Sequence, residues 1–564
     1  MVKPRLIFMN IKMNFLISNK KLSNKILLFL IFFIAIVLRL YKLGEYPIHL
    51  TNDEAAIGYN AYSILKTARD EHGEFLPIIF KSFGDWKPGL YIYATVPSVW
   101  LFGINEFATR LPSAIAGIIS VYLVYLLCKK LFTSKIAFFA SFSLAINPWH
   151  IHFSRGAWEA NLALTLLLAG IWFFYQTVKE KKYFFLIISS SFFALTLWAY
   201  QSAKLASLLP LVVLVFIYRG YLLKIPKKYL FAAVTVGLLI STPIVLSVFN
   251  GKAGRIEVMS IFSYERPKEY IQETILNQEN ITQDSLLFKL FHSEALNFAR
   301  GILGRYLNYF SGRFLFFEGD WSSLRHSSAN VGYLLFAEIP VLILGLFQLF
   351  KKRKNKEAAF FLFWLFLAPI PAAITRDSVH GVRALNLIIP LVVVLGFGLS
   401  FLIKYFKLIF IFIVFPVYLY SMLIYINSYY VQNLFVNAKN YFYGYREVVK
   451  ELDAIGKNKA IVFDQSFDQP YIFFLFYQRI EPSIYQEQVD FSEVISGDVG
   501  FVNKLNNILF RPITWENDKE LKNTLIVGKA VKFPLDEVEN IEVYNLKKIK
   551  YPNGDDDFYI VERK

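Results

Sequence analysis

Two adjacent carboxylates, Asp53 and Glu54, lie in the segment TNDEAAIGYNAYSILK directly after the first long apolar run. A carboxylate at the edge of a membrane can act as a general base that takes a proton from an attacking hydroxyl group. Both residues also follow Thr51 and Asn52, which are good helix N-caps, so they could instead complement a helix dipole. Neighbouring helical side chains point about 100° apart and are not expected to act on one atom. We predict that Asp53 is the base and that Glu54 orients Asp53 or the acceptor.

The same segment of the chain carries further polar residues that could contact a substrate. In ARDEHGEFLP, a histidine and two carboxylates could meet a metal ion or sugar hydroxyls, but consecutive side chains rarely converge on one ion, and a solvated loop is the alternative. In FGDWKPG, an aromatic ring beside an acid could hold a sugar, although tryptophan at a membrane interface needs no such role. The candidate substrate contacts are Asp70, Glu71, His72, Asp85 and Lys87.

Isolated cations lie at the ends of apolar segments that we place on the outer side of the membrane. The positive-inside rule disfavours cations there, and converging arginines bind a phosphate group through charge-assisted hydrogen bonds. For any single residue, snorkelling or pairing with Glu106 or Glu159 is an equal alternative. For the group we favour a phosphate site made by Arg110, Arg155, Lys204, Arg376, His380 and Arg383.

The amino-acid composition indicates that much of this chain lies in a lipid membrane. Of 564 residues, 55% are apolar and 18% aromatic, and only 18% are charged; a soluble domain cannot bury that much apolar surface. The net charge of +17 is concentrated in short clusters between apolar runs, so it indicates cytoplasmic loops and not nucleic acid. The single cysteine, Cys128, excludes disulfides and cysteine-based metal sites. The motifs of P-loop nucleotide hydrolases, serine hydrolases and zincins are absent from the sequence.

Apolar segments predict about eleven membrane-spanning helices, because a helix needs roughly 20 residues to cross the hydrocarbon layer. They lie near residues 25–41, 111–128, 136–153, 160–178, 183–200, 205–218, 229–250, 331–350, 358–375, 384–403 and 408–427. Basic clusters follow every second span, which predicts a cytoplasmic N-terminus and an extracytoplasmic C-terminus in a multi-pass protein of the plasma membrane. The basic segment 1–24 precedes an uncleaved anchor in this interpretation. Glu338, within a span, is expected to face the protein interior.

The remaining segments predict two outer loops and a soluble domain. Residues 90–103 are too short to cross and contain Pro97, so we expect a surface helix within an outer loop of residues 42–110. A second outer loop covers residues 251–330. Residues 431–564 predict a small extracytoplasmic α/β domain, in which YFYGYREVVKELDAIG is a helix and AIVFD, NTLIVG and FYIVER are strands.

Several sequence blocks together resemble a known family. They are HLTNDEAAIGYNAYSI, KPGLYIY, LFGINEFATRLPSAIAG, INPWHIHFSR, FLFFEGDWSSLRHSS and PIPAAITRDSVHGVRALNLIIP. Across about residues 25–430 the chain resembles the dolichyl-phosphate-mannose-protein mannosyltransferase-like GT-C glycosyltransferases, a group that includes the lipid A aminoarabinose transferases. The blocks leave the C-terminal domain unexplained.

The resemblance implies transfer of one sugar, mannose or similar, from a polyprenyl-phosphate donor to a hydroxyl group at the outer membrane face. The acid of the first outer loop maps onto Asp53, with Glu54 beside it, and Arg110 and Arg155 match basic positions that either bind the lipid phosphate or brace the loop. A single displacement would invert the anomeric configuration. No nucleotide sugar is expected as the donor, and no cofactor is predicted. Whether the reaction requires a divalent metal is left open.

The predicted fold class is therefore an all-α polytopic membrane protein of GT-C type with a small C-terminal α/β domain. Its expected partners are the lipid-linked donor, a glycolipid, protein or cell-wall acceptor, and membrane lipid, but not nucleic acid. Two alternatives belong to other classes. A transporter or flippase of lipid-linked sugars would carry polar groups at mid-membrane depth, and a non-catalytic scaffold would not need Asp53.

Overall fold

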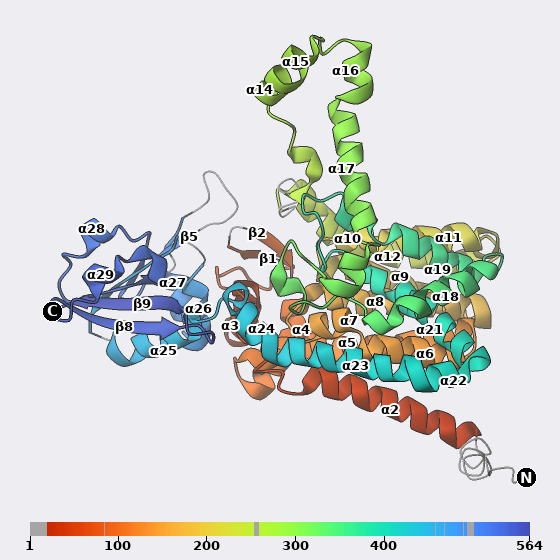
Figure 1. Ribbon diagram of the computed structural model, residues 1–564. Coiled ribbons are helices and arrows are strands. Elements are labelled where there is room, and N and C mark those ends of the chain that lie inside the picture. The colour runs from red at the N-terminus through yellow and green to blue at the C-terminus, as the bar shows by residue number, and fades with distance from the viewer. Residues whose placement is uncertain are drawn as a thin grey trace, which may run out of the picture.

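The computed structural model describes residues 20–83, 85–252, 259–456, 458–466, 469–488, 490–492 and 501–564. Figure 1 shows a bundle of long helices that lie side by side, with a sheet-containing domain at one end. The C-terminus belongs to that domain, and the first described helix, α2, runs along the bundle. Most of the predicted N-terminal segment 1–24 lies outside the described residues.

Each predicted span overlaps a helix of the bundle. These helices are α2 (Lys20–Leu40), α5 (Glu106–Leu131), α6 (Ser134–Ile146), α8 (Glu159–Glu180), α9 (Phe184–Ala199), α11 (Leu208–Leu222), α12 (Lys227–Phe249), α18 (Ile339–Lys351), α19 (Lys356–Leu367), α21 (Ile388–Tyr405) and α23 (Phe415–Asn427). Short helices adjoin them: α7 (Pro148–Ser154), α10 (Ala203–Ala206), α20 (Ile370–Ala373), α22 (Lys407–Ile409) and α24 (Asn433–Val436).

In the described part of the chain, seven helical stretches are long and apolar enough to cross a membrane. They are Glu106–Leu131, Glu159–Glu180, Ala203–Leu222, Lys227–Phe249, Lys356–Ala373, Leu385–Tyr405 and Lys407–Val436. The protein is thus a multi-pass membrane protein, and the count of about eleven spans stays a prediction. Glu338 is buried, as expected, and accepts a 3.0 Å hydrogen bond from the Leu335 N–H.

The first predicted outer loop is folded. It contains α3 (Asn52–Thr67), a hairpin of β1 (Ile79–Ser82) and β2 (Asp85–Pro88), and the short apolar helix α4 (Leu90–Phe102). The predicted helix at residues 90–103 is confirmed. Helix α3 begins where the sequence places an N-cap, because the Thr51 hydroxyl accepts the Glu54 N–H while the Glu54 carboxylate accepts the Thr51 N–H.

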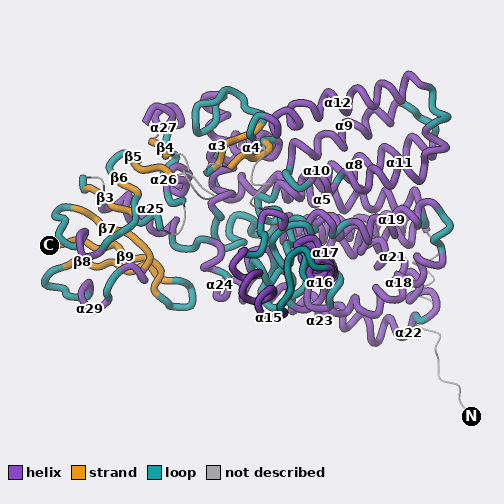
Figure 2. The backbone as a smooth tube through the Cα atoms, turned by 90° about the horizontal axis from the view of Figure 1, so that it is seen from above, coloured by secondary structure: helices purple, strands orange, loops and turns teal. Residues whose placement is uncertain are grey.

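The second predicted outer loop forms a helical arm. It comprises α14 (Lys268–Tyr270), α15 (Asn277–Glu279), α16 (Leu286–Phe291) and α17 (Glu294–Asn308). Figures 1 and 2 agree that this arm leaves the side of the bundle and runs across the direction of the long helices. After the arm, the chain returns to the bundle through a loop that contains the 3₁₀ turn η4 (Leu324–His326).

The C-terminal domain is built on a seven-stranded sheet, as Figure 2 shows, in the order β4-β5-β6-β3-β7-β9-β8. Strand β3 pairs in parallel with β6 and β7, and the other pairs are antiparallel. The strands are β3 (Ala460–Phe463), β4 (Asp490–Ser492), β5 (Phe501–Leu505), β6 (Ile508–Phe510), β7 (Thr524–Lys529), β8 (Tyr544–Lys550) and β9 (Asp556–Arg563). The helices are α25 (Tyr445–Ile455), α26 (Tyr471–Tyr477), α27 (Pro482–Gln488), α28 (Trp515–Asp518) and α29 (Leu535–Val538). The predicted helix and the three predicted strands are confirmed.

Helix α26 joins this domain to the helix that carries Asp53. Its apolar side chains are fully buried in one hydrophobic cluster with the buried face of α3. The Tyr59 hydroxyl also donates a 3.1 Å hydrogen bond to the Ile480 carbonyl. A Cβ atom at Gly58 would lie 2.5 Å from the Phe476 ring and 2.6 Å from the Thr109 hydroxyl, so the two helices touch where only glycine fits.

Gly58→Ala is therefore expected to destabilise the protein by about 1–3 kcal/mol through overpacking. The apparent unfolding temperature in detergent measures this effect. Gly304→Ala is the matched control, because its added methyl group meets no atom within 4 Å. Equal unfolding temperatures for the two variants would contradict close packing of α26 on α3.

Candidate active site

A cavity of about 600 Å³ lies between the bundle, the first outer loop and the C-terminal domain. Helix α3, the β2 strand, the start of α8, helix α10, the η4 turn and the loop before α21 all contribute to its wall. The titratable side chains that line it are Asp53, Lys87, Glu159, Lys204, Arg325, His326, His380 and Arg383. Trp158, Phe83 and Tyr200 supply aromatic surface. This combination of an acid, several cations and aromatic rings suits a sugar carried on a phosphate.

Asp53 and Glu54 diverge, as the helix geometry predicts. Asp53 lines the cavity, keeps 40% of its side-chain surface exposed, and forms an ion pair with Lys87. Glu54 is buried and turns away from the cavity lining. An accessible carboxylate can take a proton from a bound hydroxyl group, whereas a buried one is committed to its partners.

The buried Glu54 side chain holds neighbouring segments of the chain together through hydrogen bonds. Its carboxylate accepts hydrogen bonds from Arg110 Nε at 3.0 Å, from the Ala157 N–H at 2.9 Å and from the Thr51 N–H at 3.0 Å. Arg110 also donates to the carbonyl groups of Leu43, Pro47 and His49, at 3.2, 2.9 and 2.6 Å. The pair thus joins the start of α3, helix α5 and the turn before α8.

Arg155 likewise connects separate segments of the chain through hydrogen bonds. It is fully buried and donates to the carbonyl groups of Leu38, Tyr41, Lys42 and Tyr46 and to the Tyr429 hydroxyl. Neither Arg110 nor Arg155 lines the cavity. For these two residues the structure favours the loop-bracing alternative over phosphate contact, because their donors already have partners.

The remaining predicted cations divide between two cavities. Lys204, His380 and Arg383 line the cavity with Asp53, and Lys87, which was predicted only as a substrate contact, joins them. Arg376 instead lines a separate cavity of about 480 Å³ at the base of the helical arm. Arg383 is held in place, since its Nη1 donates to Asp377 at 2.6 Å and to the Thr375 hydroxyl at 2.8 Å.

The second predicted polar cluster lies away from the cavity. Asp70 accepts the N–H groups of His72 and Glu74, which is a local turn, and Glu71 is buried against Asn60. Burial raises the pKa of Asp70 to about 6 and that of Glu71 to about 8, and it lowers the pKa of His72 to about 4. None of the three lines the cavity. Asp85 lies in β2, and its side chain is outside the described part of the structure.

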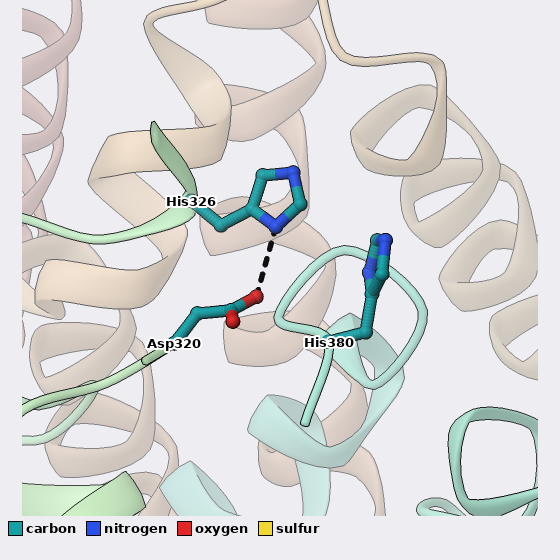
Figure 3. A group of neighbouring side chains, drawn as sticks. All are labelled: Asp320, His326 and His380. Atoms are coloured by element: carbon teal, nitrogen blue, oxygen red, sulfur yellow. Dashed lines mark hydrogen bonds and ion pairs between the residues drawn. The ribbon is translucent and has the colours of Figure 1, made fainter. Parts of the chain in front are cut away.

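Two histidines and an aspartate form a compact group at the cavity wall (Figure 3). His326 Nδ1 lies 2.8 Å from Asp320 Oδ2, and the His326 and His380 rings are 4.7 Å apart. Both histidines line the cavity, with the fully buried Asp320 behind them. Burial lowers the pKa of His326 below its ordinary value although Asp320 opposes this, and burial with the nearby Arg383 lowers the pKa of His380 strongly.

Sequence reasoning did not assign Trp158, Arg325, His326 or Asp320 to a site. The last three lie in FLFFEGDWSSLRHSS, which carries family resemblance, but no spacing rule relates them to His380 more than 50 residues later. The signal that could have found them is one histidine in each of the two late family blocks, His326 in FLFFEGDWSSLRHSS and His380 in PIPAAITRDSVHGVRALNLIIP, among only seven in the chain.

Comparison with known proteins supports the resemblance. Residues 87–246 match the family model of the dolichyl-phosphate-mannose-protein mannosyltransferases. The putative mannosyltransferase YkcB of Bacillus subtilis is 27% identical over 167 residues, which are 29% of this chain and 22% of that protein. The matched region thus spans about a fifth of the length of that curated relative.

The fold is similar to that of ArnT from Cupriavidus metallidurans. The ArnT structure bound to undecaprenyl phosphate superposes with a TM-score of 0.53 at 11% identity, covering 96% of this chain and 98% of ArnT. The apo ArnT structure gives the same TM-score at 12% identity, with 97% and 98% covered. The shared fold therefore includes the C-terminal domain, which the sequence blocks left unexplained. Together these matches show the ArnT fold over almost the whole chain and a similarity to the mannosyltransferase model over residues 87–246.

Proposed function

We propose that this protein is an inverting glycosyltransferase that moves one sugar from a polyprenyl-phosphate donor to a hydroxyl acceptor at the outer membrane face. The observation that carries the proposal is the accessible Asp53 carboxylate in one cavity with Lys87, Lys204 and Arg383. The mannosyltransferase family match and the undecaprenyl phosphate in the ArnT structure support the same donor chemistry.

The reaction is a single displacement at the anomeric carbon. The acceptor oxygen forms a bond to that carbon and gives its proton to Asp53, while the bond from the carbon to the phosphate oxygen breaks. The leaving polyprenyl phosphate takes the bonding electrons, and the cationic side chains stabilise its growing charge. Attack opposite to the leaving group inverts the anomeric configuration.

Lys87 can interact both with the base, Asp53, and with the phosphate group of the donor. Its ammonium group pairs with Asp53 and lies 5.6 Å from the centre of the Phe83 ring. An anionic phosphate that enters the cavity competes with Asp53 for Lys87, and a weaker ion pair makes the Asp53 carboxylate a better proton acceptor. In this scheme donor binding prepares the base.

Lys87→Met should lower kcat/KM for the lipid-linked donor by about 10²-fold, because one charge-stabilising contact contributes about that much. Initial rates at varied donor concentration measure this. Lys81→Met on the neighbouring strand is the matched control, since Lys81 does not line the cavity. The same loss in both variants would point to damage to the hairpin and would count against phosphate binding by Lys87.

The donor sugar is proposed to be mannose or a similar hexose or pentose, and the acceptor a glycolipid, a protein or a cell-wall polymer. Purified protein incubated with a panel of polyprenyl-phosphate sugars, with products read by mass spectrometry, tests this directly. Transfer from no member of the panel would contradict the proposal.

The proposed orientation has the N-terminus in the cytoplasm and the cavity and C-terminal domain outside the plasma membrane. The order of the basic clusters along the chain supports it. A flippase is less well supported, because the cavity lies beside the C-terminal domain and Glu338, the carboxylate predicted deep in a span, is bonded to backbone.

A further inference from the structure

The group made by Asp320, His326 and His380 comes from two segments that approach each other only in the folded protein. One ligand atom of each residue lies within 4.8 Å of those of the other two. His326 belongs to the η4 turn, Asp320 precedes it, and His380 lies in the loop before α21, as Figure 3 shows. Such convergence of two imidazoles and a carboxylate needs an explanation beyond packing.

Asp320 is arranged as an oriented ligand. Its Oδ1 accepts the N–H groups of Ser322 and Ser323, both at 3.0 Å, and its Oδ2 accepts the Gly381 N–H at 2.8 Å. These bonds fix the carboxylate and tie it to the loop of His380. Outer hydrogen bonds of this kind orient the ligands of metal sites.

We propose that Asp320, His326 and His380 bind one divalent cation of the zinc type, with an open coordination position toward the cavity. Two nitrogen ligands and one oxygen ligand are a donor set that suits Zn²⁺ and neighbouring transition metals. The cation would replace the proton shared between His326 Nδ1 and Asp320 Oδ2. Three protein ligands leave a fourth position free, and the two imidazoles at the cavity wall place that position on the side of the substrate.

The surrounding positive charges oppose a bare cation and favour one that is bound together with an anion, because Arg325 and Arg383 line the same cavity. Arg383 lies close to His380 in the chain but is paired with Asp377, and Arg325 lines the same cavity. A phosphate oxygen on the open position would be flanked by these guanidinium groups. The cation site itself is independent of the proposed reaction; only this role in phosphate binding rests on the proposed function.

The test is a direct measurement of metal binding by the full-length protein. The protein is purified in detergent with an affinity tag that contains no histidine, stripped with a chelator, re-equilibrated with ZnCl₂ and assayed by elemental mass spectrometry. We expect about one zinc per chain in the wild type and roughly a tenth or less in His380→Ala and His326→Ala. Co²⁺ loading should give visible d–d absorption in the wild type and lose it in both variants.

His292→Gln is the matched control, because His292 also lies 3.0 Å from a carboxylate, that of Glu279, but on the helical arm. It should keep the zinc. His380→Ala decides the outcome if His326→Ala does not fold, since the described bonds of the His380 side chain include only a 3.3 Å contact with the Arg383 N–H. Wild-type protein that takes up no zinc, or His380→Ala that retains it, would overturn the site.

The two proposals fail in different ways. If zinc binds to the three residues but no sugar is transferred, the glycosyltransferase proposal fails and the cation site stands. If sugar is transferred equally by metal-free wild-type protein and by His380→Ala, and neither binds zinc, the cation site is wrong and the transfer reaction stands.

Discussion

Asp53→Asn is expected to lower sugar transfer by about 10²–10⁴-fold, the usual contribution of a general base. The asparagine amide keeps the size of the side chain but cannot accept a proton from the acceptor hydroxyl. Affinity for the lipid-linked donor should be unchanged or higher, because Lys87 no longer pairs with a carboxylate at position 53 and phosphate competes with one partner fewer. Single-turnover rates, together with donor binding measured separately, check both expectations.

Asp284→Asn, an exposed acid on the helical arm, is the control and should transfer sugar at the wild-type rate. Asp53→Glu should restore part of the activity, since it returns a carboxylate to the same cavity. Wild-type activity in Asp53→Asn would show that another group accepts the proton. A loss confined to donor affinity would assign Asp53 to binding.

Glu54→Gln, at the residue next to Asp53, is expected to lower the stability of the folded protein. It leaves the buried Arg110 guanidinium without its counter-charge, and breaking a buried pair costs about 3–5 kcal/mol. The apparent unfolding midpoint should fall, and the yield of folded protein should fall with it. Arg110→Met should have a similar effect, and the double variant Glu54→Gln/Arg110→Met should cost less than the sum of the two single variants, because the two residues share one interaction.

Glu180→Gln is the matched control for this experiment. Its ion pairs with Lys130 and Lys182 are exposed to solvent, so only a small loss of stability is expected. Normal stability of Glu54→Gln combined with lost transfer would place Glu54 in the chemistry and would contradict the bracing role. Additive effects of the Glu54 and Arg110 variants would also argue against it.

The contrast between these neighbours shows what a sequence can predict about a site. The capping pattern places the start of α3, and helical geometry predicts that Asp53 and Glu54 point in different directions. The apolar segments, the short helix at residues 90–103 and the three strands of the C-terminal domain follow from apolar runs and alternation, and each overlaps a helix or strand of the structure. These features depend on local sequence, which is why they were predictable.

The direction of long cationic side chains depends on distant segments and was not predictable. Arg110 and Arg155 lie at helix ends, as expected for phosphate ligands, but backbone carbonyl groups from the segment before α3 bind both guanidinium groups. The meeting of His326 with His380 likewise depends on how two loops pack. Position along a span fixes depth in the membrane, whereas tertiary packing decides what a side chain contacts.

The close fit of α26 against α3 has a consequence for how this protein can be re-engineered. Exchanging the C-terminal domain for that of a relative is a natural way to seek a new acceptor. Here, however, the ring of Phe476 occupies the space above Gly58, which lies five residues after Asp53 on the same helix. A transplanted domain would therefore have to bring its own version of α3 with it, and the practical boundary for a chimaera runs through the first outer loop and not through the linker after α23.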